Sequence, residues 1–235
     1  MTSVETNPRK TQKPQKILVV GATGGTGRAT IDQLVEQGYR VTAFSRHADA
    51  LAETSDLVTA FNGDATNPAD VDQAVRAHDA VIVTLGITEN PLRVRLFGTA
   101  RTPLDVRSVG TRNVITAMRQ HGVRRLVVQT TYGVGETRDK LRWVERLFFS
   151  LLLKPQIADT EVQEFEVRKS DVDWIMAQPV HLTDDDNREM PFASAEGEVR
   201  EWKISRRSVA RFLARAAQAP DYIGQAVALS GGGES

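Results

Sequence analysis

The sequence predicts an α/β protein in which helices cover both faces of a doubly wound parallel sheet. Short apolar runs rich in β-branched residues alternate along the chain with segments of helical periodicity, which is the pattern of βαβ units. The first run, residues 17–20, leads through a glycine-rich turn into a helix that stops at Gly38. Because βαβ crossovers are right-handed, consecutive strands of this kind build a parallel sheet that is buried on both faces.

The same reading places the remaining elements. Further strands are expected at residues 39–44, 57–61, 80–85, 126–131, 173–177 and 226–229. Helices are expected at residues 70–77, 105–121, 141–153 and 157–169, and Ser205 is expected to cap a helix that runs through Ala217. No Pro-, Gly- or Ser-rich linker divides the chain. Residues 15–235 are therefore predicted to form one domain behind a flexible tail of residues 1–14. A small C-terminal substrate lobe is expected mainly from residues 138–204.

Composition excludes several classes of function. Of the 235 residues, 40% are hydrophobic and 26% are charged, which is close to the average of soluble globular proteins. The 30 basic residues balance the 30 acidic ones, so general binding to a nucleic-acid backbone is not expected. The chain has no cysteine and four scattered histidines, so we expect no metal site. No apolar run is long enough to span a membrane and no secretory signal is recognisable, so we expect a cytoplasmic protein.

The strongest motif is the turn between the first strand and the first helix, Gly21-Ala22-Thr23-Gly24-Gly25-Thr26-Gly27. Glycines at this spacing permit a tight turn and let the backbone approach a pyrophosphate closely. The following helix presents free N–H groups and the positive end of its dipole to the phosphates. The motif therefore predicts a Rossmann-like sheet that binds a dinucleotide through Gly21, Thr23, Gly24, Gly25, Thr26 and Gly27. The alternative is a glycine-rich turn with a purely structural role.

The end of the second strand indicates which dinucleotide is bound. The strand ends in Phe44-Ser45-Arg46-His47, without the carboxylate that would bond the ribose 2′-OH of NAD. Arg46 and Ser45 suit a 2′-phosphate, so NADP(H) is preferred over NAD(H). A plain surface role for Arg46 is the alternative. Two further strand ends are expected beside the cofactor, contributing Asp64 and Ala65 near the adenine, and Thr84, Leu85 and Gly86 farther along.

These motifs resemble the short-chain dehydrogenase/reductase superfamily. More narrowly, they resemble its atypical NAD(P)H-binding branch, which includes flavin reductase/biliverdin-IXβ reductase and NmrA-like proteins. The resemblance covers about residues 16–230. Its C-terminal part comprises Asp173-Trp174-Ile175, Gln178-Pro179, Leu182-Thr183, Ile204-Ser205-Arg206 and Val209-Ala210. It implies that the nicotinamide reaches toward the end of the fifth strand and the segment after the sixth, contacting Thr130, Tyr132, Pro179 and Val180.

The sequence departs from the superfamily at its catalytic pair. Typical members use Tyr-x-x-x-Lys, in which the lysine lowers the pKa of the tyrosine so that it can pass a proton. None of the three tyrosines, Tyr39, Tyr132 and Tyr222, has a lysine four residues later. If Glu164 is aligned with the family's usual acid, Gln156 and Thr160 occupy the two positions. Either hydride goes to an acceptor that takes its proton from solvent, or the chain binds the cofactor without catalysis.

Two residues are candidates for contact with a substrate. Thr131 closes the fifth strand, where superfamily members carry their active-site serine, and its hydroxyl can orient a carbonyl. A hydroxyl satisfied by neighbouring backbone is the alternative. His181 matches the segment in which the biliverdin-IXβ reductase family carries a pocket histidine, and an imidazole there can supply a proton or bind a carboxylate. A lone histidine after a strand with a structural role is the alternative.

Charge and apolarity are unevenly distributed along the chain. Residues 91–125 hold eight arginines and one acid, Asp105. The segment 91–107 is expected to attract an anionic small-molecule substrate, unless these arginines form a solvated face. The apolar segment 143–153 suits a substrate lid, a homodimer face or a helix packed on the sheet edge. The oligomeric state stays open.

The predicted function is an NADPH-dependent oxidoreductase of the atypical short-chain type. It would deliver hydride to a conjugated planar acceptor, flavin- or tetrapyrrole-like, without a Tyr-Lys pair. The main alternative is a non-catalytic NADP(H)-binding sensor or regulatory protein of the NmrA-like kind. A sugar-nucleotide epimerase is a third option, and the missing Tyr-x-x-x-Lys pair argues against it.

Overall fold

The computed structural model describes residues 16–86, 102–140 and 154–233, with the backbone only at residues 154–156. The expected tail of residues 1–14, most of the arginine-rich segment 91–107 and the expected helix 141–153 lie outside the described residues. So does the side chain of Gln156. In the described part, no helix is both long and apolar enough to cross a membrane.

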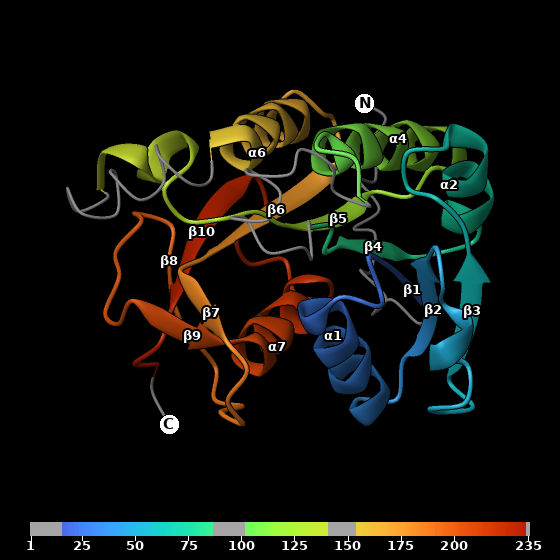
Figure 1. Cartoon of the computed structure of the whole chain (residues 1–235), viewed down its shortest axis with the longest axis horizontal. Coiled ribbons are helices and arrows are strands. Elements are labelled where there is room, and N and C mark those ends of the chain that lie inside the picture. The colour runs from blue at the N-terminus through green and yellow to red at the C-terminus, as the bar shows by residue number, and fades with distance from the viewer. Residues whose placement is uncertain (1–15, 87–101, 141–153, 234–235) are drawn as a thin grey trace, which may run out of the picture.

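The core of the molecule is an eight-stranded sheet that confirms the predicted fold class (Figure 1). In spatial order its strands are β3 (Val58–Asn62), β2 (Arg40–Ser45), β1 (Lys16–Val20), β4 (Ala80–Val83), β5 (Arg125–Gln129), β6 (Asp173–Pro179), β10 (Gln225–Ser230) and β8 (Phe192–Ser194). All neighbouring pairs are parallel except β10 with β8.

The strand order reverses beside β1. From β1 the chain proceeds outward through β2 to β3, and then returns to β4 on the other side of β1. Val20 of β1 pairs with Phe44 of β2 on one side and with Val83 of β4 on the other. The connections that leave β1 and β4 therefore diverge at the carboxyl edge of the sheet. This divergence opens the crevice in which doubly wound sheets bind ligands.

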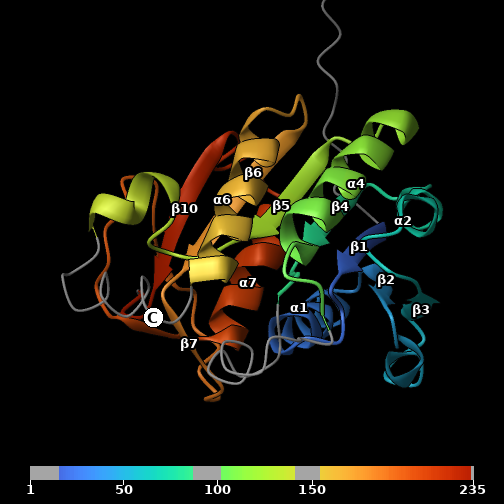
Figure 2. The same ribbon diagram turned by 45° about the horizontal axis from the view of Figure 1, so that its top comes forward.

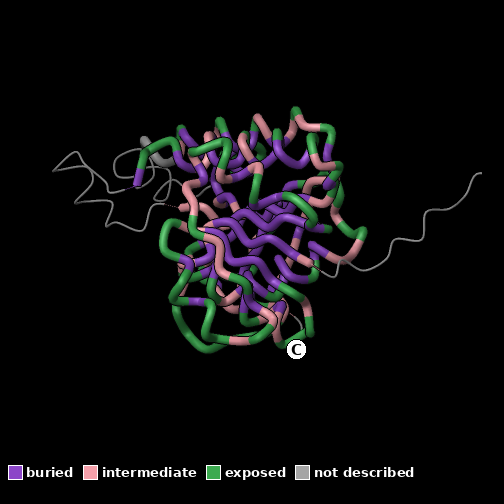
Figure 3. The backbone as a smooth tube through the Cα atoms, turned by 90° about the vertical axis from the view of Figure 1, so that its right-hand side faces the viewer, coloured by how far each residue is buried: buried purple, intermediate pink, exposed green. Residues whose placement is uncertain are grey.

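Helices cover both faces of the sheet. One face carries α1 (Gly25–Glu36) and α7 (Arg206–Ala216), and the other carries α2 (Pro68–Val75), α4 (Val106–His121) and α6 (Lys154–Arg168) (Figures 1 and 2). Each face encloses its own apolar cluster, with Val19 and Ile82 on the α1 side and Val20 and Val83 on the α4 side. Figure 3 shows the strands as a continuous buried layer between the helices.

Local chemistry explains where the helices begin and end. The hydroxyl of Ser205 accepts a 2.9 Å hydrogen bond from Ser208 N, which confirms the predicted cap of α7. Asn67 caps α2, and Pro68 follows it at the first helical position, where a missing N–H costs nothing. Gly122 ends α4 in the left-handed region at φ +70°.

The structure contains elements that the sequence pattern did not indicate. Two short strands, β7 (His181–Thr183) and β9 (Lys203–Ser205), form a separate parallel pair beside α7. β7, β8 and β9 have only three residues each, which is too few to show the alternation typical of a strand. Two 3₁₀ turns, η1 (Asp49–Leu51) and η2 (Gly135–Lys140), were also not predicted. β6 continues beyond Ala177 to Pro179, whose carbonyl oxygen accepts a 3.0 Å hydrogen bond from Tyr132 N.

A buried histidine links β2 to the connection between α2 and β4. His78, in the connection between α2 and β4, is 8% exposed. Its Nδ1 lies 3.0 Å from the carbonyl oxygen of Arg76, and its Nε2 lies 2.7 Å from the hydroxyl oxygen of Thr42. Because a carbonyl only accepts, Nδ1 carries the proton and Nε2 accepts from Thr42. Burial, reinforced by the charge of Lys16, lowers the pKa of His78.

This histidine predicts a loss of stability in mild acid. With the folded-state pKa of His78 below its unfolded value, the unfolded chain binds more protons once the pH drops below about 6.5. The free energy of unfolding should therefore fall faster for the wild type than for His78→Gln between about pH 7 and pH 5. Urea unfolding of both proteins across this range measures the difference. Equal slopes for the two proteins would show that the protonation of His78 is not coupled to folding.

Candidate functional site

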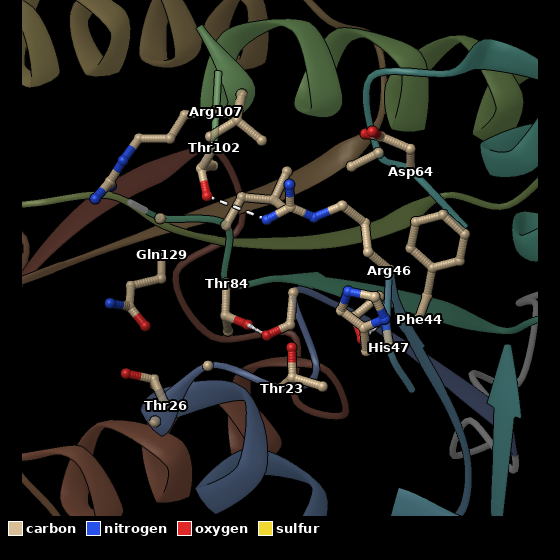
Figure 4. Close-up of a pocket in the computed structure, with 18 of the residues that line it drawn as sticks. Thr23, Thr26, Phe44, Arg46, His47, Asp64, Thr84, Thr102, Arg107 and Gln129 are labelled. Carbon is tan, nitrogen blue, oxygen red and sulfur yellow. Dashed lines mark hydrogen bonds between the residues drawn. The ribbon is translucent and has the colours of Figure 1, made fainter. Parts of the chain in front are cut away.

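A cleft lies at the carboxyl edge of the sheet, at the reversal of strand order (Figure 4). The turn after β1 and the ends of β2, β3, β4 and β5 form it, together with the starts of α4 and α7 and one residue of β7. The predicted cofactor residues that line it are Gly21, Thr23, Gly24, Gly25, Thr26, Ser45, Arg46, Asp64, Ala65, Thr84, Leu85 and Gly86. The structure thus brings most of the predicted set together in one cavity.

The glycine turn packs so closely that side chains are excluded at two positions. Gly21 has φ +87°, and a Cβ added there would stand 2.8 Å from the carbonyl oxygen of Thr84. A Cβ on Gly27 would stand 2.3 Å from the carbonyl oxygen of Gly21. Gly27 itself does not line the cleft, so its contribution is to let α1 lie against the turn. These contacts bring the start of α1 up to the cleft, as the dinucleotide motif requires.

The first turn of α1 is suited to an anion. Its N-cap residue, Gly24, makes no side-chain cap, and the turn contains no acidic side chain. Arg206 covers this turn, with its Cδ 2.8 Å from the position that a Cβ of Gly25 would take. An ion pair of 2.6 Å between Arg206 Nη1 and Asp184 Oδ1 holds the arginine there. Free N–H groups beside a guanidinium are the surroundings that a pyrophosphate requires.

The end of β2 forms another part of the cleft. The Arg46 side chain extends from β2 to the segment before α4, where its Nη2 donates a 3.1 Å hydrogen bond to the hydroxyl of Thr102. His47 lies beside it (Figure 4). Asp64 also lines this end, and its Oδ1 accepts hydrogen bonds from the amide and the hydroxyl of Thr66. Among the described lining residues, this one carboxylate faces the three arginines Arg46, Arg107 and Arg206, so the cleft is electropositive.

The remaining predicted residues do not line the cleft. Thr130 is buried and donates a 2.8 Å hydrogen bond to Glu164. Tyr132 is also buried, and its hydroxyl donates to the carbonyl oxygen of Gly197 at 3.1 Å. Pro179 and Val180 are buried at the end of β6 and just after it. The candidates for substrate contact are the partly buried Thr131 and His181, which is exposed at the start of β7.

Glu164 explains why Thr130 turns away from the cleft. This carboxylate is almost fully buried on α6 and accepts from Thr130 and from Gln178 Nε2, at 2.8 and 2.7 Å. Its second oxygen accepts from Arg168 Nη2 at 3.2 Å. The hydrogen bonds connect the ends of β5 and β6 to α6, and they supply the donors that a buried carboxylate requires. In this structure Glu164 supports the strands rather than the cavity.

Several lining residues stand outside the predicted cofactor set: Phe44, His47, Gly63, Thr102, Pro103, Val106, Arg107, Gln129, Leu182 and Arg206. Four of them, including Arg107, belong to the segment 91–107 that was expected to attract an anionic substrate. A signal existed for Gln129, because it is the last residue of β5 and strand ends converge at this edge. Leu182 and Arg206 belong to the C-terminal motifs of the resemblance, but their place in the cleft follows from the pairing of β7 with β9. Within the described ranges, no group of three metal-binding side chains is present.

Comparison with known proteins identifies a family. A family model described as NAD(P)H-binding matches residues 21–220. The match agrees with the resemblance that the glycine motif and the strand ends indicated.

Solved structures with low sequence identity share the fold. ChuY, an anaerobillin reductase from Escherichia coli O157:H7, is 23% identical and has a TM-score of 0.74, with 94% of this chain and 98% of that chain covered. A short-chain dehydrogenase/reductase from Veillonella parvula in complex with NADP is 16% identical and has a TM-score of 0.75, with 94% and 96% covered. A Rossmann-fold NAD(P)-binding family protein from Shigella flexneri is 23% identical and has a TM-score of 0.66, with 94% and 95% covered.

The packing of the glycine turn predicts unequal effects of two alanine substitutions. Gly27→Ala forces a methyl group against backbone atoms and should lower the free energy of unfolding by about 1–3 kcal/mol. Gly24→Ala is its matched control, because that Cβ would lie 3.4 Å from the nearest atom and the residue already has an extended backbone. Its cost should stay below about 1 kcal/mol. Chemical unfolding measures both. Equal costs would contradict the close packing of Gly27 against Gly21.

Proposed function

We propose, from the chain's membership of the NAD(P)H-binding family, that it is an NADPH-dependent reductase of the atypical short-chain type. It would transfer hydride to a conjugated planar acceptor, such as a flavin or a tetrapyrrole. The observation that carries the proposal is the cleft itself. At the reversal of strand order, it combines an uncapped helix N-terminus with arginines at separate positions along its wall.

Arg46 is the proposed partner of the 2′-phosphate. It stands at the end of β2, where NAD-binding members of such folds place a carboxylate against the ribose. Its guanidinium is already held by Thr102 on the far side of the cleft, so less side-chain freedom is lost when a phosphate binds. Ser45 and His47 flank it and can contribute further polar contacts. This placement favours NADP(H) over NAD(H).

The first turn of α1 and Arg206 are the proposed pyrophosphate site. Both NADPH and NADH carry this group, so this contact contributes affinity without discriminating between them. The nicotinamide would then extend past Thr84, Leu85 and Gly86 toward the end of β5. We retain Thr130, Tyr132, Pro179 and Val180 as proposed neighbours of the nicotinamide on the family resemblance alone.

The proposed reaction makes little demand on protein acids. NADPH, when bound, supplies a hydride, so the acceptor gains two electrons and one hydrogen. The accompanying proton would come from solvent, because the described lining of the cleft contains neither tyrosine nor lysine. Flat conjugated acceptors spread the added charge over a ring system, so the protein mainly has to orient the two rings. Thr131 and His181 remain proposed contacts for this acceptor.

A non-catalytic NADP(H) sensor is the second candidate function. The observation that favours it is that Thr131 and His181 lie outside the cleft lining in this structure. A cleft that binds the cofactor without these two residues on its described lining would serve recognition as well as reduction. The two candidates share every residue of the cofactor site and differ only in turnover.

Two arginine substitutions test the cofactor site. Arg46→Ala should weaken NADPH binding about tenfold to hundredfold and leave NADH binding unchanged, because only NADPH carries the phosphate that Arg46 would contact. Arg206→Ala should weaken both dinucleotides alike, because they share the pyrophosphate. The fluorescence of the bound reduced nicotinamide gives both dissociation constants.

Arg207→Ala is the control for that experiment. Arg207 is the neighbour of Arg206 on α7, pairs with the exposed Asp186 and does not line the cleft. Its substitution should leave both dissociation constants unchanged. An equal effect of Arg46→Ala on NADPH and NADH would refute the 2′-phosphate assignment. The absence of binding by either dinucleotide would refute both candidate functions.

A turnover measurement separates the reductase from the sensor. NADPH oxidation at 340 nm, in the presence of FMN or biliverdin, should proceed above the rate without protein if the chain is a reductase. At low NADPH concentration, the rate of oxidation by Arg46→Ala should fall by the same factor as its affinity for NADPH. Tight NADPH binding with no acceleration by either acceptor would instead support the sensor.

A further inference from the structure

Two polar side chains on the wall of the cleft are not assigned to any phosphate of the proposed cofactor. Arg107 is in the first turn of α4, and Gln129 is the last residue of β5. Figure 4 shows both on the side of the cleft opposite Arg46, His47 and Asp64. Arg107 borders the end of β4, since a Cβ on Gly86 would lie 3.4 Å from its Nη2. The two residues thus lie where the cleft extends beyond the proposed path of the phosphates.

Neither side chain is satisfied by the described part of the protein. Arg107 Nε and Gln129 Oε1 are both buried, and neither has a hydrogen-bond partner among the described residues. A buried polar atom without a partner costs about 1–3 kcal/mol, so native structures rarely retain one without a reason. A donor and an acceptor left in this condition on one cavity wall indicate a ligand that satisfies both.

Asp159, the carboxylate whose charge acts on Arg107, already accepts hydrogen bonds from the backbone. Asp159 of α6 accepts hydrogen bonds from the backbone N–H groups of Arg107 and Ser108, at 3.0 and 3.1 Å, and so caps α4. It makes no ion pair with the Arg107 guanidinium. Burial lowers the pKa of Arg107 and the charge of Asp159 opposes that shift, while a guanidinium keeps its proton in any case. Arg107 is therefore a partly buried cation on the wall of a cavity, with a fully buried Nε that has no partner among the described residues.

The other two arginines of the cleft have partners within the protein. Arg46 is bonded to Thr102, and Arg206 is paired with Asp184. Their positions account for the 2′-phosphate and the pyrophosphate of the proposed cofactor, which are the anionic groups of NADPH. NADPH therefore has no further anionic group for Arg107 to bind. An anion that binds Arg107 would come from a different molecule.

We infer that Arg107 and Gln129 form a subsite for the hydride acceptor, and that this acceptor carries a carboxylate or phosphate together with an N–H. The anionic group binds the Arg107 guanidinium, and the N–H donates to Gln129 Oε1. The inference rests on the proposed function, because it assumes that the cofactor occupies the rest of the cleft. It narrows the acceptor from any flat conjugated molecule to one with these two groups.

Matched pairs of compounds test the subsite by binding alone. FMN and riboflavin differ by one phosphate, and biliverdin and its dimethyl ester differ by two carboxylates. Each is titrated into the NADP⁺-saturated full chain, and absorbance changes report binding. In the wild type, the anionic member of at least one pair should bind about tenfold tighter or more than its neutral partner. The pair that shows the difference distinguishes a phosphate ligand from a carboxylate ligand.

Three variants assign the effect to its residues. Arg107→Ala should abolish the advantage of the anionic member and leave the affinity for the neutral member and for NADP⁺ unchanged. Gln129→Leu should weaken both members alike, because the N–H is common to both. Arg112→Ala is the control on the same helix, since its half-exposed side chain pairs with Glu166 outside the cleft and should change nothing.

Four results would overturn the subsite. The anionic members bind no tighter than the neutral ones, their advantage survives in Arg107→Ala, or none of the four compounds binds at about 1 mM. The fourth result is that Arg107→Ala weakens the binding of NADP⁺ as strongly as the binding of the acceptor, which would assign Arg107 to the cofactor site. The proposed function fails separately, through loss of NADPH binding or of its dependence on Arg46. Thermal unfolding of each variant shows whether it is folded.

Discussion

The contact of backbone with backbone at the first βα turn is the constraint on which the site depends. Gly21 must adopt φ +87° under the carbonyl of Thr84, and Gly27 must lie against the carbonyl of Gly21. Because nothing larger than hydrogen fits at either glycine, β1, β4 and the start of α1 meet at one point. That point is also where the strand order reverses. A larger residue at Gly21 or Gly27 would therefore displace the helix N-terminus from the crevice that the topology creates.

Electrostatics then divides the crevice into regions. Its described lining holds arginines from the end of β2, the start of α4 and the start of α7, against the one carboxylate of Asp64. The protein holds Arg46 through Thr102 and Arg206 through Asp184. It leaves Arg107 Nε without a partner among the described residues. Partnered cations are already oriented for a ligand, whereas a guanidinium with a buried, unpartnered N–H gains a hydrogen bond when an anion binds. This contrast separates the proposed cofactor region from the proposed acceptor region.

Away from the cleft, a buried polar network fixes the strand ends. Glu164 holds Thr130 and Gln178, and through them the ends of β5 and β6, to α6. The sequence places Thr130 at a strand end, and so next to the cofactor, but a hydroxyl at such a position can turn to either side. The carboxylate from α6 decides the side here. Tyr132 likewise donates its hydroxyl to Gly197, a residue 65 positions away, and so faces the segment between β8 and β9.

The sequence by itself determined what depends on neighbours along the chain. The alternation of strands and helices, the glycine turn, the cap at Ser205 and the arginine after β2 are local patterns, so the fold class, the family and one side of the cleft could be predicted. Tertiary structure alone decided what depends on distant pairings. Three-residue strands carry no readable period, so the pairing of β7 with β9, which brings Leu182 and Arg206 to the wall of the cleft, could not be predicted from alternation. The sequence likewise did not show that Arg107 lacks an ion pair with Asp159. This follows from tertiary structure, because Asp159, 52 residues away, caps α4 instead of pairing with the guanidinium.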